Sequence, residues 1–193
     1  MPAIVLPERL HAGSMRHRAA MMTANPIIPE PIDKAHYAAL LALNERVVEK
    51  TAPLNEAKLH RFVTGAVYAR QVAQGEGLLI VLDETADFYD SPNFEFFADR
   101  HGSFYYVDRI IVGQALTGQG VGRRLYADLT EWIGRSGGGH LCCEVNTQPP
   151  NPVSHKFHQA IGFTACGEGS WTGDEGKTKH VHYYEMAIAP LKS

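Results

Sequence analysis

The sequence predicts one mixed α/β domain, in which a mixed sheet is flanked by about four helices. Its 193 residues suffice for one core, and 45% hydrophobic with 20% charged residues are ordinary proportions for a globular domain. Strand-like and helix-like segments alternate in the middle of the chain, which favours parallel pairing. Near both ends strands follow one another through short turns, which favours antiparallel pairing.

The hydrophobic patterns place most elements. Helical periodicity marks four segments, namely 33–50, 55–67, 121–133 and 152–161. Strand-like composition marks 68–73, 78–82, 103–112, 140–145, 162–166 and 180–188, with a hairpin through QGEG and a turn at 172–179. The aromatic segment 87–102 (DFYDSPNFEFFADRHG) fits neither period, and we expect an ordered loop there. Residues 1–25 show neither periodicity nor a signal-peptide core, which predicts an extension before a single domain over 26–193.

Composition narrows the function classes. A formal charge of −3 without a basic run argues against a nucleic-acid partner, and no apolar run is long enough to span a membrane. Three cysteines, an odd number without framework spacing, favour a reducing cytoplasm. The pairs His155/His158 and His180/His182 have no Cys-x-x-Cys beside them, so we expect no metal site.

A glycine-rich stretch, LTGQGVGRRL at 116–125, precedes the third helix. It lacks the Lys-Ser/Thr of a P-loop, and its G-x-G-x-G spacing is not the G-x-G-x-x-G of dinucleotide folds. Because it joins a strand to a helix, its successive N–H groups could surround a diphosphate. A plain tight turn is the alternative interpretation.

Two motifs then resemble those of one family. IIVGQALTGQGVGRRLYADL (110–129) resembles the central motif of the GNAT superfamily of N-acetyltransferases, with Thr117 where the family has Arg or Gln. NPVSHKFHQAIGF (151–163) resembles a later motif of that superfamily, with Ser154 in place of Ala and His158 in place of Tyr. The resemblance extends over about residues 30–188 and is firmest over 104–163.

The resemblance implies a GNAT-like, largely antiparallel sheet with one splayed parallel strand pair, and acetyl-CoA as co-substrate. The strand residues Ile110, Ile111 and Val112 would pair with its pantetheine arm. Residues implied to bind the rest of the cofactor are Thr117, Gly118, Gln119, Gly120, Val121, Gly122, Arg123 and Asn151. The implied reaction moves an acetyl group to the primary amine of a small molecule or peptide. A non-catalytic acyl-CoA-binding module and an unrelated anion-binding protein are the alternatives, and a homodimer is a common default.

The acid and base are harder to assign. The family position makes Glu144 the first candidate for the base that deprotonates the amine, with Asp108 as a second, on the strand face of Ile110 and Val112. His158 would protonate the leaving thiolate as an imidazolium. Each of these residues could instead be structural. In the aromatic loop, Tyr89, Asn93, Phe94 and Phe97 could line the acceptor pocket or pack in the core.

Overall fold

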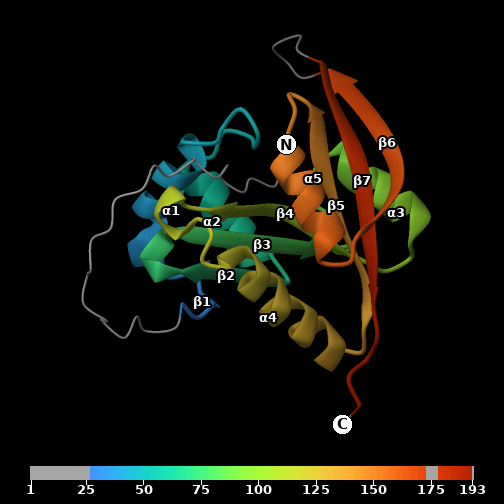
Figure 1. Ribbon diagram of the computed structural model, residues 1–193, viewed down its shortest axis with the longest axis horizontal. Coiled ribbons are helices and arrows are strands. Elements are labelled where there is room, and N and C mark those ends of the chain that lie inside the picture. The colour runs from blue at the N-terminus through green and yellow to red at the C-terminus, as the bar shows by residue number, and fades with distance from the viewer. Residues whose placement is uncertain (1–26, 173–177, 193) are drawn as a thin grey trace, which may run out of the picture.

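The computed structural model describes residues 27–172 and 178–192, so the expected extension at 1–25 and most of the turn at 172–179 lie outside the described residues. Within them, seven strands form one sheet in the order β1-β2-β3-β4-β5-β7-β6 (Figure 1). All neighbouring strands pair antiparallel except β4 and β5, which are parallel. The predicted mixed, largely antiparallel sheet is therefore confirmed.

Along the described chain, β2, β3 and β4 follow one another as neighbouring strands, and from β4 to β6 strands alternate with helices. The strands are β1 (Glu30–Pro31), β2 (Tyr68–Val72), β3 (Gly77–Asp83), β4 (Tyr105–Val112), β5 (Gly139–Gln148), β6 (Thr164–Thr172) and β7 (Thr178–Ile188). The α-helices are α1 (Tyr37–Glu45), α2 (Glu56–Gly65), α3 (Pro92–Arg100), α4 (Val121–Arg135) and α5 (Pro152–Ala160). Short 3-10 turns cover Lys34–His36, Ala73–Gly75 and Gln114–Leu116.

Two predicted segments need correction. The first helix ends at Glu45 rather than near residue 50, because the chain turns over 46–50. The expected loop at 87–102 contains helix α3, which begins at Pro92 after the N-cap Ser91, whose hydroxyl accepts a hydrogen bond from the N–H of Phe94 at 3.4 Å. Aspartate, asparagine and proline at its start look like a turn, whereas Phe94 and Phe97, three apart, fix its buried face.

Two apolar cores occupy the two faces of the sheet. On one face, α4 and α5 pack over strand residues of the central sheet, with Leu125, Leu129 and Ile133 fully buried. On the other face, α1, α2 and α3 cover a more aromatic core, which includes Phe62, Phe97 and others. Figure 1 shows α4 and α5 in front of the sheet in this view. Strand β5 contributes alternate side chains to the two cores, so its two faces have different chemistry.

Candidate active site

Strands β4 and β5 pair only briefly. Tyr105 pairs with Leu141 and Tyr106 pairs with Cys142 in parallel register. The later residues of β4 and β5, all of which the structure describes, do not pair with each other. The register of β4 against β3 shifts where Val81 pairs with Val107 and Ile80 with Arg109, which inserts one extra residue, Asp108. A bulge of this kind bends a strand. We therefore attribute the separation of β4 from β5 to the bulge.

The bulge also changes which way β4 side chains point. Ile110 and Val112 belong to the core under α4, together with Val107, while Ile111 and Tyr106 belong to the core under α1–α3. Strict alternation would place Asp108 with Ile110 and Val112, as the sequence suggested. That prediction is wrong, because the extra residue resets the alternation.

Where β4 ends, the glycine loop leads into α4. Gly118 and Gly120 have φ values of 76° and 74°, a left-handed conformation that favours glycine, and Gly120 precedes α4 without a side-chain cap. A Cβ added at either glycine would meet nothing within 4 Å, so the space over the loop is open. No side chain caps the first N–H groups of this 15-residue helix, and the positive end of its dipole lies at the same place. This arrangement can bind an anion.

Thr117 adds a second observation at the loop. Its hydroxyl oxygen is buried and has no hydrogen-bond partner in the described part of the chain. Buried polar groups without partners are rare in proteins. A phosphate oxygen would supply the missing acceptor.

The carboxyl group of Glu144 is buried beyond the point where β4 and β5 separate, on the face covered by α3. Glu144 is 1% exposed, and its two oxygens accept hydrogen bonds from Nδ2 of Asn93 at 3.1 Å and from the hydroxyl of Tyr106 at 2.6 Å. Burial raises the pKa of Glu144 to about 8, although both hydrogen bonds oppose this shift. A carboxyl group with such a pKa can accept a proton near neutral pH.

Asp108 and Arg109 form a second buried pair beside Glu144. The Nε of Arg109 lies 2.5 Å from Oδ2 of Asp108, and its Nη1 donates to Oδ1 of Asn44 at 2.7 Å. The second oxygen of Asp108 and the hydroxyl of Tyr89 have no partner at hydrogen-bonding geometry within the described residues. Burial, followed by the charges of Asp108 and Glu144, raises the pKa of Tyr89. Asp108 therefore forms its ion pair with Arg109 through one carboxylate oxygen only.

His158 lies on α5, on the opposite face of the sheet. Its Nδ1 is 2.7 Å from the carbonyl oxygen of Ser154, and its Nε2 is 2.9 Å from the hydroxyl of Tyr126. Burial lowers the pKa of His158 to about 4. The ring is therefore neutral near pH 7, with Nδ1 donating to Ser154 and Nε2 accepting from Tyr126. The sequence assigned the proton donation to an imidazolium, a form that this environment disfavours.

The other predicted site residues divide into two groups. Ile110, Ile111 and Val112 pair with β3 and lie at the gap, and residues 117–123 form the loop and the start of α4. Asn151 is the N-cap of α5, where its side chain accepts from the N–H of Ser154 at 3.4 Å. Of the predicted acceptor residues, Asn93 contacts Glu144, while Tyr89 and Phe94 pack edge-to-face at a centroid distance of 5.4 Å.

Sequence reasoning missed several residues that contact this site. They are Asn44, Tyr106, Tyr126 and Tyr183. Only Tyr126 lies in one of the two motifs, and each of the four residues meets its partner across more than 30 positions of sequence, so tertiary packing alone brings the pairs together.

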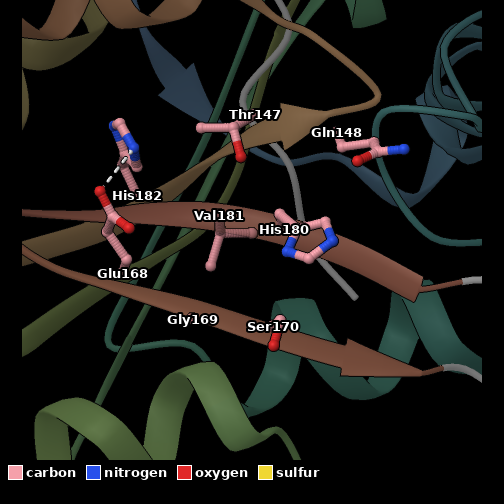
Figure 2. A pocket seen from close by; sticks show the side chains of 8 residues that line it. All are labelled: Thr147, Gln148, Glu168, Gly169, Ser170, His180, Val181 and His182. Carbon is pink, nitrogen blue, oxygen red and sulfur yellow. Dashed lines mark ion pairs between the residues drawn. The ribbon is translucent and has the colours of Figure 1, made fainter.

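A surface pocket lies elsewhere. It has a volume of about 450 Å³ and is formed by the end of β5 and the facing parts of β6 and β7; Figure 2 shows Glu168 and His182 directed toward one another there, 3.2 Å apart. A second pocket of about 360 Å³ shares Thr147 and His182 with it and extends along α5. Neither is lined by Glu144 or by the glycine loop, so we assign the candidate site from its chemistry rather than from pocket size.

The gap between two parallel strands, the uncapped start of α4 at its end and the buried carboxyl beside it match the acyltransferase type of fold that the sequence motifs implied. The chain belongs to the acetyltransferase (GNAT) family, whose profile matches residues 65–163. No curated protein matches the chain. Within the described residues, no helix has the length and apolar character needed to cross a membrane.

Solved structures with this fold include three well-matched examples. Arabidopsis thaliana NAA60, in complex with a bisubstrate analogue, superposes with a TM-score of 0.64 at 12% identity, covering 84% of this chain and 98% of that one. The ribosomal-protein-S18-alanine N-acetyltransferase of Escherichia coli gives 0.61 at 14%, covering 86% and 96%. A phosphinothricin acetyltransferase of Sinorhizobium meliloti in complex with AcCoA gives 0.60 at 17%, covering 84% and 89%. At these low sequence identities, the structural similarity establishes the fold and nothing beyond it.

Proposed function

We propose that the protein is an acetyl-CoA-dependent N-acetyltransferase that acetylates the primary amine of a small molecule or peptide. The observation that carries this proposal is the buried carboxyl of Glu144 at the gap between β4 and β5, with the anion-binding loop at the end of the same gap. The family and the acetyl-CoA complexes of structural neighbours support the co-substrate.

The loop residues suit the diphosphate of acetyl-CoA. The open space over Gly118 and Gly120 admits phosphate oxygens to the N–H groups of residues 118–122, and the unpartnered hydroxyl of Thr117 can donate to one of them. The edge of β4 at 110–112 offers main-chain groups to the pantetheine arm. Bound acetyl-CoA supplies the thioester carbonyl that the amine attacks; the new C–N bond replaces the C–S bond, and CoA leaves as a thiolate that takes a proton from water.

Glu144 takes the proton of the acceptor. An alkylammonium has no free electron pair, so it must lose a proton before its nitrogen can attack. The ionised carboxylate of Glu144 accepts this proton directly or through a water molecule, and Asn93 and Tyr106 hold it in place. Its pKa of about 8 makes it a stronger base than a solvent-exposed glutamate.

His158 has a supporting role in this proposal. With both ring nitrogens engaged, it joins α5 to Tyr126 of α4 and so fixes the helix that follows the loop. Asp108 neutralises Arg109 and, through its charge, contributes to the raised pKa of Glu144.

Two measurements test the proposal. Calorimetry with acetyl-CoA should show binding, and with pantetheine, which lacks the phosphates, much weaker binding. A thiol-release assay with a panel of amines, peptides included, should then find turnover above the rate without protein. Absence of CoA binding would overturn the proposal, whereas binding without thiol release for any amine would indicate a non-catalytic acyl-CoA-binding module.

A further inference from the structure

Two glycines of β6 make room for one tyrosine ring. A Cβ at Gly169 would overlap the hydroxyl of Tyr183 and lie 2.6 Å from its Cζ. A Cβ at Gly167 would lie 2.9 Å from Cζ of Phe96 and 3.4 Å from Cδ2 of Tyr183. Neither glycine has a positive φ, so the backbone conformation of the strand does not require glycine at these positions. Glycine is required there because the tyrosine ring approaches the backbone closely.

The other side of the Tyr183 ring is also fixed. Phe96 of α3 stacks on it, with ring centroids 3.9 Å apart and an interplanar angle of 15°. The ring is 5% exposed and lies between α3 and the backbone of β6. With its ring immobilised, Tyr183 can direct its hydroxyl at one target, and that target is Oδ1 of Asn93 at 3.0 Å.

Asn93 therefore has each end of its amide engaged. Its oxygen accepts from Tyr183, and its Nδ2 donates to Oε1 of Glu144 at 3.1 Å. An amide rotated by 180° would turn its oxygen toward the carboxylate and its nitrogen toward the tyrosine. The phenol oxygen could accept from the rotated amide, but the phenol proton would then lose Oδ1 as its acceptor and the amide oxygen would face the carboxylate, so both contacts oppose that rotation.

We propose that Tyr183 is a positioning residue: its hydroxyl, held by Phe96, Gly167 and Gly169, locks the Asn93 amide in the orientation that donates to Glu144. The inference rests on the proposed role of Glu144 as the base. It extends the site from β5 through α3 and β7 to the edge strand β6. Tyr183 acts without touching the acceptor or acetyl-CoA.

A test of this inference must leave the other ionisable side chains near Glu144 unchanged. They are Tyr106, Asp108 and Arg109 of β4, Tyr89 before α3, Cys142 and Cys143 of β5, and Tyr183 itself. The decisive variant, Tyr183→Phe, leaves all others in place. It keeps the ring that stacks on Phe96 and removes only the hydroxyl.

In Tyr183→Phe the Asn93 amide loses one of the two contacts that fix its orientation, so its hydrogen bond to the carboxylate of Glu144 becomes weaker. The pKa of Glu144 should rise by about one unit, as expected when the hydrogen bond from Asn93 to the charged carboxylate is weakened. The acid limb of the kcat/KM profile should move up by the same amount. The rate should therefore fall about tenfold on that limb and stay near wild type on the alkaline plateau.

Tyr184→Phe is the matched control. It removes a hydroxyl from the next residue of β7, which bonds Nδ1 of His155 at 2.9 Å and belongs to the core on the other face. Its profile should not move. Asn93→Ala should shift the profile at least as far as Tyr183→Phe, and adding Tyr183→Phe to Asn93→Ala should change nothing more.

Carbon-13 NMR of the Glu144 carboxyl in the full chain, without acetyl-CoA, separates this inference from the proposed function. The resonance is identified by its loss in Glu144→Gln. A higher titration midpoint in Tyr183→Phe supports the positioning role even if Glu144→Gln retains activity, in which case only the base assignment fails. An unchanged midpoint in Tyr183→Phe, or an equal shift in Tyr184→Phe, would overturn the inference.

Discussion

Each face of the sheet buries a group that the sequence proposed for proton transfer, and burial shifts the pKa values of Glu144 and His158 in opposite directions. Glu144, on the face of α1–α3, has two donors at its oxygens, a second carboxylate nearby and a pKa raised to about 8. His158, on the face of α4 and α5, is held between Ser154 and Tyr126, and its pKa is lowered to about 4. Burial disfavours the charged form in both cases.

The consequence differs because the groups carry opposite charges when ionised. A carboxyl with a raised pKa becomes a useful base near neutral pH, whereas an imidazole with a lowered pKa stays neutral and loses its value as an acid. The comparison teaches that equal burial prepares one residue for proton transfer and the other for structure. Four predictions follow from it, from the largest effect to the smallest.

Glu144→Gln tests the first face. Removing the base should lower kcat/KM by roughly 10²–10⁴-fold, the usual size of such a contribution, while the acetyl-CoA dissociation constant hardly changes. Wild-type kcat/KM should rise with pH to a midpoint near 8, and the variant should lose that rise. Glu168→Gln, which changes an exposed carboxyl in the pocket between β5, β6 and β7, is the control for thiol release. Near wild-type turnover in Glu144→Gln would leave catalysis to Asp108 or to substrate positioning.

His158→Phe tests the second face. The variant leaves the Ser154 carbonyl and the Tyr126 hydroxyl without their partner, which should lower the free energy of unfolding by about 2–4 kcal/mol. In urea titrations at pH 7.5, the exposed His180→Gln should have little effect. If fully folded His158→Phe instead loses the alkaline limb of its kcat profile, then His158 is the proton donor and the contrast between the faces fails.

The pH dependence of stability should have opposite signs for the two groups. The raised pKa of Glu144 means that the folded state holds its proton longer, so its stabilisation is complete below the unfolded pKa near 4.5 and is lost as pH rises toward 8. The lowered pKa of His158 makes stability fall as pH drops from 6.5 toward 4. Urea unfolding between pH 6.5 and 8 should give a negative slope that Glu144→Gln reduces by up to about 1.4 kcal/mol per pH unit. Equal slopes in both proteins would contradict the raised pKa.

Gly120→Val tests whether the glycine loop at the start of α4 binds acetyl-CoA. Its matched control is Gly137→Val at the other end of α4, where φ is 107° and a Cβ would also meet nothing within 4 Å. Both variants carry similar strain, about 1–2 kcal/mol for a left-handed residue with a side chain. Only Gly120→Val should weaken acetyl-CoA binding in calorimetry, by at least about tenfold. Equal affinities would mean that the glycines serve the turn alone.

Much of this molecule follows from local sequence. The alternation of apolar residues determined the strands and helices around the glycine loop, and the motifs at 110–129 and 151–163 indicated the family that the profile match then established. Local patterns suffice there because the spacing of glycines and apolar residues is set by the backbone of the loop and of α4 itself. Helix α3 was missed because its first residues favour a turn, and its aromatic face gains stability only against the sheet.

The environment of each titratable group was decided by tertiary structure. Sequence placed Glu144 on a strand, but the donors Asn93 and Tyr106 come from α3 and β4, and Tyr183 from β7. The face of Asp108 depended on a bulge that is defined only by the register of β4 against β3. A pKa depends on burial and on neighbours within a few ångströms. Those neighbours are distant in sequence, so only the packing of the strands and helices could select them.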